Sequence, residues 1–498
     1  MLSSWTGCCS CISQRWTFSI MSFLALCIGN AMRSVLSITI TEMVYPIHNV
    51  TNQTHERCIA PTEHAPDNAT AASFGDRYHW DEFTQGLILS SIFWGYAPTQ
   101  FIYGSLAERF GGKYFLGQAI FIPSLLTLAT PLVIDWGGST ALIIIRILMG
   151  VSSSAMYPSV SSMVPHWTTA KNRTRFGTFI CAGFILGPVF GTVMPALIIK
   201  YTGSGWPAVF YFFGALGISW FPFWVLLCFN NSDDHPFITD RERRYLQDSL
   251  EKEVCKKPPP APYAHIFRSK QVWAFVIGLF GCDWAYFTMA TDLPKFMSNI
   301  VGLPIDQNGY LSALPYLCMW LNSTLSSWLV DWVIARDLMT ITNVKKLLTV
   351  VAAIGSSGFI LLATYSGCDL TLIVACFVAS ITLMGCAYPS IMMNNLDLSP
   401  NYAGTLMAFG NGVAALGGVF SPYLVGVLTK NQTMAEWRMV FWIGFFIALA
   451  SSVFVAFHSS SDIQYWNDPN FERDANKVVT KRTKKKYAGD GKIDTAVL

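Results

Sequence analysis

One apolar run of this sequence, from Trp16 to Met43, is long enough to cross a membrane and yet carries an arginine well inside it. A membrane-spanning helix needs about 20 mostly apolar residues. A charge near the centre of a bilayer costs at least ~2.5–3.5 kcal/mol, so such a side chain normally faces a protein interior or a wet cavity. Arg33 therefore predicts that the rest of the chain builds a polar site around it.

The whole chain is too apolar for a string of soluble domains. Of its 498 residues, 52% are hydrophobic and 13% are charged, whereas soluble domains carry about 25% charged residues. Hydropathy windows give twelve candidate spans, with limits near 16–43, 83–103, 114–134, 140–165, 176–200, 207–229, 271–293, 307–334, 347–365, 370–394, 403–428 and 437–458. We therefore predict an all-α membrane protein with twelve transmembrane helices, including tight hairpins at 135–139 and 366–369.

Lysine and arginine indicate the orientation. With the N-terminus inside, most basic residues fall in inner segments, as in the positive-inside pattern. The outer loops then hold only Arg57, Arg77, Lys200, Lys295 and Lys430. An even number of helices places both termini in the cytosol and the loop 45–83 outside. That loop carries three sequons, which predict glycosylation at Asn49, Asn52 and Asn68.

The chain divides into two halves of similar sequence. A polar central loop, 230–270, separates an N-terminal half (1–229) from a C-terminal half (271–458), and a polar tail follows (459–498). Three pairs of matching segments lie at similar offsets: Glu108 and Asp331 are 223 residues apart, Phe190 and Phe420 are 230 apart, and Trp206 and Trp437 are 231 apart. Two six-helix halves with a site between them near the midplane are typical of transporters.

The inner loop after the second span reads Gly104-Ser-Leu-Ala-Glu-Arg-Phe-Gly-Gly-Lys113 and looks like the inner-loop signature of the major facilitator superfamily. Gly104 would let two helices approach closely, and Glu108 would face the positive end of a helix. With Arg109 and the repeat counterpart Asp331, these residues form a predicted conformational latch. The alternative is an ordinary polar turn.

Further motifs narrow the resemblance. They are Tyr78-His-Trp-Asp81, Gln85 to Tyr96, Arg146-Ile-Leu-Met-Gly150, Tyr157-Pro158, Leu293-Pro294, Asp306 to Tyr316, Thr342 to Lys346 and Asn395-Leu-Asp397-Leu-Ser-Pro400. Together they resemble the anion–cation symporter family, which includes type I sodium–phosphate cotransporters, sialin and the vesicular glutamate transporters. The pattern is most similar to the insect putative inorganic phosphate cotransporters.

The resemblance implies that Arg33 and Arg146 bind an anionic substrate. The free-energy cost of a charge inside a membrane leads to the same expectation, because two unneutralised cations in apolar helices need an anion. Arginine binds carboxylate or phosphate bidentately. A structural ion pair with a buried carboxylate is the alternative for each arginine. Asp283 would either bind a coupling cation or neutralise an arginine. Neutral candidates for the lining of the cavity are Tyr157, Tyr286, Asn322, Asn394 and Asn411, with helix–helix hydrogen bonding as their alternative.

Three departures from the family pattern bear on coupling. Sialin and the glutamate transporters carry a glutamate where this chain has Ser153 and a histidine where it has Ser161. Some members carry a histidine where it has Asn395. The groups best suited to carry a proton are therefore missing, which favours Na⁺ over H⁺ and disfavours glutamate as the substrate.

The sequence therefore predicts a secondary transporter of phosphate or a small organic anion, coupled to a cation. The alternative within the family is a sialin-like proton-coupled transporter of acidic sugars in lysosomes or vesicles. We expect no enzyme activity, because HExxH and GxSxG motifs are absent, and no cofactor or metal site, because no two CxxC pairs occur among the 13 cysteines. The net charge of +3 is too small to indicate a nucleic-acid partner. We expect a monomer in the plasma membrane, with a lysosomal or vesicular membrane as the alternative.

Overall fold

The computed structural model describes residues 13–45, 77–202, 205–233, 235–250, 261–299, 305–367, 369–429, 433–468 and 471. The predicted glycosylation sites Asn49, Asn52 and Asn68 lie outside these ranges, so glycosylation stays a prediction.

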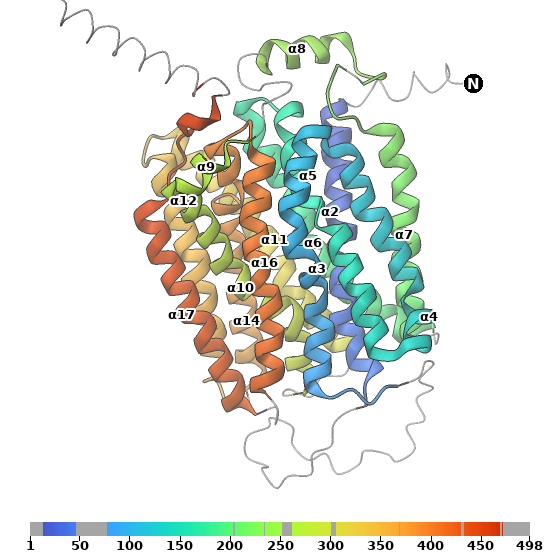
Figure 1. Cartoon of the computed structure of the whole chain (residues 1–498). Coiled ribbons are helices and arrows are strands. Elements are labelled where there is room, and N and C mark those ends of the chain that lie inside the picture. The colour runs from blue at the N-terminus through green and yellow to red at the C-terminus, as the bar shows by residue number, and fades with distance from the viewer. Residues whose placement is uncertain are drawn as a thin grey trace, which may run out of the picture.

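The described residues form a bundle of long, roughly parallel helices (Figure 1). The first six spans are built from α2 (Gln14–Met43), α3 (Glu82–Phe110), α4 (Gly112–Ser153), α5 (Met156–Trp167), α6 (Ala170–Thr202) and α7 (Gly205–Leu227). Two short helices follow, α8 (Asp240–Leu250) and α9 (Tyr263–Arg268). The last six spans are built from α10 (Lys270–Asn299), α11 (Ile305–Ala335), α12 (Ile341–Val350), η1 (Val351–Gly355), α13 (Ser356–Ala363), α14 (Leu370–Met384), η2 (Gly385–Ala387), η3 (Ile391–Met393), α15 (Asn394–Leu398), α16 (Ala403–Leu428) and α17 (Met434–His458), and the short turn η4 (Tyr465–Asn467) comes last.

The twelve-span prediction is confirmed. Within the described ranges, nine helical segments are long and apolar enough to cross a membrane. One of them, Gly112–Trp167, has 56 residues, which at 1.5 Å per residue is far longer than the ~30 Å hydrocarbon core. It turns back at Gly138, whose φ of 58° favours glycine, so it provides two spans and the hairpin predicted at 135–139. Helices α3 and α11 supply the remaining two spans.

Elements at the two ends of the bundle define a direction. Figure 1 shows α8 beside the first turn of α2, at the end of the bundle that we call the α8 end. At the opposite end, α2 finishes near the start of α3, where Val44 pairs with Tyr78 in an isolated bridge.

Close packing of α6 on α2 sets the position of the first span. Gly183, Gly187 and Gly191 recur every four residues on α6 and face α2. A Cβ atom at Gly183 would lie 2.2 Å from the Phe23 carbonyl oxygen, and one at Gly191 would lie 2.7 Å from that of Ala31. Small residues at such intervals let two helices in a membrane approach backbone to backbone. The row therefore fixes the height and rotation of α2.

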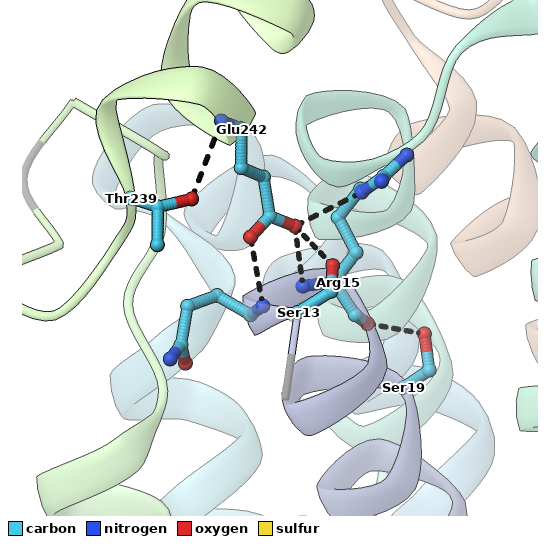
Figure 2. A network of polar contacts seen from close by, with 6 residues as sticks. Ser13, Arg15, Ser19, Thr239 and Glu242 are labelled. Atoms are coloured by element: carbon cyan, nitrogen blue, oxygen red, sulfur yellow. Dashed lines mark hydrogen bonds and ion pairs between the residues drawn. The ribbon is translucent and has the colours of Figure 1, made fainter. Parts of the chain in front are cut away.

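The surface helix α8 is attached to the beginning of α2 (Figure 2). Glu242 of α8 accepts hydrogen bonds from the backbone N–H groups of Gln14 at 3.0 Å and Arg15 at 3.2 Å, and also from the Ser13 hydroxyl and Arg15 Nε. The first N–H groups of a helix have no partner within the helix, and the positive end of the helix favours an anion. Glu242 therefore caps α2 from more than two hundred residues away.

Candidate functional site

Arg33 lies at the centre of the bundle and faces α3. Its guanidinium carbon is 4.5 Å from the centroid of the Tyr96 ring and 5.5 Å from that of Phe93. Stacking on aromatic faces suits the weakly hydrated guanidinium. Arg33 Nη2 is buried and has no hydrogen-bond partner in the described structure.

Arg146 of α4 is the second cation of the site. The residue is 4% exposed, and its Nε is buried without a hydrogen-bond partner among the described residues. It lies in the electrostatic field of Arg33, so each guanidinium makes the other more costly to bury. An anion between them would relieve this repulsion and supply the missing acceptors.

Both arginines line one cavity between the first six and the last six spans. Its wall includes Asn30 of α2 and Tyr286, Phe287 and Thr291 of α10, and its volume is about 20 Å³. A cavity of this size holds about one water molecule, which is too little for an organic anion. The arginine pair therefore borders a cavity with room for a water molecule but not for such an anion.

Asp283 of α10 is the predicted intramembrane carboxylate, and it is 5% exposed. It lies in the field of Arg33. Yet the ion pairs of the described chain, with atoms within 4.0 Å, join neither Arg33 nor Arg146 to it. Asp283 thus reduces the positive potential of the site without occupying the hydrogen-bonding positions of the arginines.

Tyr157 and Tyr286 belong to an aromatic cluster around Phe184 of α6. The Phe184 ring centroid lies 5.4 Å from that of Tyr157, 5.2 Å from that of Tyr286 and 6.2 Å from that of Tyr388. The Tyr157 hydroxyl is buried and has no partner in the described residues. Tyr157, the cluster's tyrosine on α5, is thus free to bond a ligand.

Sequence reasoning missed Tyr388 and Phe184. A signal for Tyr388 was present, because Tyr388-Pro389-Ser390 repeats Tyr157-Pro158-Ser159 at an offset of 231 residues. Both copies follow a break in a helix: α4 ends at Ser153 and α5 begins at Met156, while α14 ends at Met384 and gives way to short 3₁₀ turns. Interrupted spans at matching places in the two halves mark substrate sites in transporters.

The three asparagine candidates have different surroundings. Asn411 of α16 donates to the Tyr96 hydroxyl at 2.9 Å, which holds the ring on which Arg33 stacks. Asn322 of α11 donates to the Thr382 carbonyl at 2.7 Å, a helix–helix bond outside the arginine cavity. Asn394 is 2% exposed, and both polar atoms of its amide lack partners in the described part of the chain.

Glu108 reaches across to the first turn of α16 at the α8 end. Its two carboxylate oxygens accept the backbone N–H and the hydroxyl of Thr405, each at 2.6 Å. Four residues before it and on the same side of α3, Gly104 packs so closely on α16 that a Cβ atom there would lie 2.4 Å from Ala408 Cβ. Arg109 is exposed, with its guanidinium carbon 5.4 Å from the Phe110 ring centroid. The latch itself stays a prediction.

Asp331, the repeat counterpart of Glu108, is placed differently. It lines a separate crevice between α6 and α11, together with Arg175. It lies in the field of Arg175. The two side chains are nevertheless not joined by an ion pair among those of the described residues. Glu108 therefore bonds to the opposing half of the protein, whereas Asp331 borders a crevice.

The fold and the arginine pair between two sets of six spans define a membrane transporter. Residues 18–422 match the family described as Major Facilitator Superfamily, so the chain belongs to that superfamily. Within it, the relatives place the chain in the group of type I phosphate cotransporters, sialin and vesicular glutamate transporters, which confirms the resemblance stated above.

Three relatives illustrate the match. The chain is 33% identical to sialin of Ovis aries over 92% of this chain and 91% of the relative. It is 30% identical to a putative inorganic phosphate cotransporter of Drosophila melanogaster, over 92% and 87%, and 29% identical to vesicular glutamate transporter 3 of Danio rerio, over 93% and 76%.

Solved structures support the fold alone. A D-xylose–proton symporter aligns with a TM-score of 0.61 at 13% identity, covering 91% of this chain and 100% of that structure. A bacterial homologue of the human lysosomal transporter spinster, in an inward-facing and unoccupied conformation, aligns with a TM-score of 0.59 at 12% identity, covering 90% and 97%.

Proposed function

We propose that this protein is a secondary transporter that moves inorganic phosphate or a small organic anion together with a cation by alternating access. The observation that carries the proposal is the arginine pair. Arg33 and Arg146 line one cavity between the two sets of six spans, and each keeps a buried nitrogen atom without a partner in the described structure. A carboxylate or phosphate accepts two parallel bonds from such a group.

The alternative is a sialin-like transporter of acidic sugars or other organic anions in a lysosomal or vesicular membrane. It is supported by the 33% identity to sialin over most of both chains. Aromatic rings beside the arginines, those of Phe93, Tyr96 and Tyr286, would suit an anion with an organic body better than inorganic phosphate.

We propose Na⁺ as the coupling ion, with Asp283 as its carboxylate ligand. The side chains of Ser153, Ser161 and Asn395 do not change protonation state near neutral pH, and they stand where relatives of the resembled family have a glutamate or a histidine. Asp283 is buried beside Arg33. No ion pair among the described residues joins the two side chains, so the carboxylate oxygens of Asp283 remain available to a cation.

The remaining proposals concern the oligomeric state, the location of the termini and the membrane. We propose a monomer with both termini in the cytosol, in the plasma membrane, with the lysosomal or vesicular membrane as the alternative. The start of α2 and the surface helix α8 lie at the same end of the bundle, as a cytosolic N-terminus and central loop require.

Uptake into reconstituted vesicles tests the function. Labelled phosphate, urate, sialate and glutamate are offered separately, with and without a Na⁺ gradient and across a pH step. We expect saturable uptake of phosphate or one organic anion that is driven by Na⁺. Uptake driven by the pH step alone would favour the sialin-like alternative, and the absence of gradient-driven uptake for all four would contradict the transporter proposal for these substrates.

A further inference from the structure

A crevice of about 630 Å³ opens between α2, α6 and α11 toward the α8 end, away from the arginine cavity. Its volume lies in the range of about 300–1,000 Å³ that is usual for ligand pockets. Half of the residues that line it are aromatic: Trp16, Phe23, Phe176, Phe179, Trp320 and Trp328. The proposed transport mechanism does not use this crevice.

The internal repeat relates the crevice to a close helix contact elsewhere in the bundle. On the opposite side of the bundle, Gly104 of α3 and Ala408 of α16 touch closely. Their counterparts at offsets of 223 and 230 residues are Ser327 of α11 and Thr178 of α6, and both line the crevice. Ser327 and Thr178 thus border a gap at the place where their counterparts are in contact.

The polar residues of the crevice have unmet bonding capacity. Thr178 is 9% exposed, and its hydroxyl oxygen is buried without a hydrogen-bond partner in the described structure. At the same offsets, the bonded pair Glu108 and Thr405 corresponds to Asp331 and Arg175, which face the crevice without an ion-pair contact among the described residues. The crevice thus offers one cation, one carboxylate and one buried hydroxyl beside an apolar wall.

The crevice is continuous with the membrane-facing surface of α11. Trp328 is 67% exposed although it lines the crevice, and the neighbouring Leu325 and Leu321 are 59% and 49% exposed. In a membrane these side chains contact lipid tails. An occupant can therefore enter sideways from the bilayer, with its charged head at the α8 end, near Trp16 in the first turn of α2.

We propose that this crevice binds a phospholipid whose headgroup carries a primary ammonium, as in phosphatidylethanolamine. Arg175 would bind the phosphate, Asp331 the ammonium and Thr178 an ester or phosphate oxygen, while one acyl chain lies along the aromatic wall. A charge-assisted hydrogen bond from the ammonium to a carboxylate needs an N–H donor, which a quaternary choline headgroup lacks. A purely anionic headgroup such as phosphatidylglycerol would satisfy Arg175 and be repelled by Asp331.

Native mass spectrometry of the purified full chain tests this proposal, with titration of phosphatidylethanolamine, phosphatidylcholine and phosphatidylglycerol of identical acyl chains. We expect the first lipid bound to be phosphatidylethanolamine, with an affinity roughly fivefold or more above the other two, as the loss of one partly exposed charge-assisted hydrogen bond predicts. Equal affinity for all three lipids, or preference for phosphatidylglycerol, would overturn the proposal.

Matched variants locate the bound lipid. Asp331→Asn should abolish the preference for phosphatidylethanolamine over phosphatidylcholine, whereas Asp337→Asn, which removes the same charge just beyond the end of α11, should keep it. Trp328→Ala should weaken binding of all three lipids, and Trp332→Ala, an exposed tryptophan one turn further along and outside the crevice, should not. A preference that survives Asp331→Asn would place the lipid elsewhere. Because binding is measured without transport, failure of this proposal leaves the proposed function untouched.

Discussion

Glu108 and Thr405 are 297 residues apart in sequence, and the carboxylate of the first takes both the backbone N–H and the hydroxyl of the second. The bond pair joins the end of α3 to the beginning of α16, and so joins the two sets of six spans at the α8 end. Next to it, Gly404 is so close to α5 that a Cβ atom there would lie 3.2 Å from the Pro158 carbonyl oxygen. The two sets of six spans are therefore in direct contact at this place of the α8 end.

We predict that Glu108→Gln shifts the protein toward a conformation that is open at the α8 end. The neutral amide keeps the size of the side chain but loses the charge, and a hydrogen bond to a charged group contributes about 1.5–3 kcal/mol. The labelling rate of a cysteine introduced at Ser162, which faces Gly404, should rise about tenfold or more, after subtraction of labelling of the parent chain. Thr405→Val keeps the backbone bond and should give a smaller rise. Equal labelling in all three proteins would exclude the latch.

We predict that Arg146→Lys loses substrate affinity although the charge is kept. Lysine cannot reproduce the planar fork of arginine, and truncating one partner of a buried charge pair costs about 2 kcal/mol or more, equivalent to roughly 30-fold in affinity. The measurement is the Michaelis constant for uptake, with surface expression quantified alongside. Arg336→Gln serves as the control, because this arginine is exposed beyond the end of α11. Unchanged uptake by Arg146→Lys would remove Arg146 from the binding site.

The positions of the membrane spans and of the two arginines within them were predictable, because a bilayer sets the length of a span and penalises charge inside it. A length of about 20 apolar residues and the cost of a buried charge are local properties, so hydropathy placed α2 through α17 within several residues, and Arg33 and Arg146 could be singled out. The repeat, read from motifs alone, also identified Glu108 and Asp331 as counterparts.

What could not be predicted depends on packing between distant segments. Asn322 reads like a cavity residue, yet its amide is bonded to the Thr382 carbonyl, because the rotation of α11 is set by its neighbours. Asp331 and Glu108 have equivalent positions in the repeat, but only Glu108 is hydrogen-bonded to the first turn of the helix opposite it. Gly104 packs against Ala408, whereas their counterparts Ser327 and Thr178 line a crevice, and this difference becomes visible only when the opposing helices are known.

We predict that Asp283→Asn changes the cation dependence of uptake. The variant keeps the shape of the side chain but removes the charge that would hold Na⁺. Uptake at saturating substrate should lose most of its dependence on Na⁺, while Asp337→Asn, a charge removed from an exposed turn, should behave like the parent. If uptake falls but keeps the parent's Na⁺ and pH profile, Asp283 only neutralises Arg33.

We predict that Glu242→Gln loosens the contact between α8 and α2 to the same extent at pH 5.5 and at pH 7.5. Burial alone would raise the pKa of Glu242, but the hydrogen bonds from Ser13, Gln14 and Arg15 outweigh it and hold the pKa below its usual value. The stabilisation is thus fully present above the unfolded pKa of about 4.3 and is lost only as the pH falls through the lower folded pKa. The difference in melting temperature between parent and variant, measured at both pH values, checks this. A difference that vanishes at pH 5.5 would contradict the lowered pKa.

The last described segment of the chain supports the same helix end that Glu108 holds. Asn467 Oδ1 accepts the Ser399 hydroxyl at 2.7 Å and the Asn401 N–H at 3.2 Å, in the turn just before α16. The preceding Trp466 is fully buried, with its ring centroid 6.3 Å from that of Tyr402. These contacts hold η4 against the turn before α16. That turn positions the first residues of α16 opposite Glu108.

We predict that Asn467→Ala weakens the predicted latch although Asn467 is not one of the residues of the latch. The turn loses two hydrogen bonds, each contributing about 0.5–1.5 kcal/mol, so the first residues of α16 are less firmly placed opposite Glu108. Labelling of the cysteine at Ser162 should therefore rise, by less than in Glu108→Gln. Asn467→Asp keeps the accepting oxygen and should restore the parent rate. If Glu108→Gln raises the rate equally whether or not Asn467→Ala is present, the two contacts act independently and the tail does not position the latch.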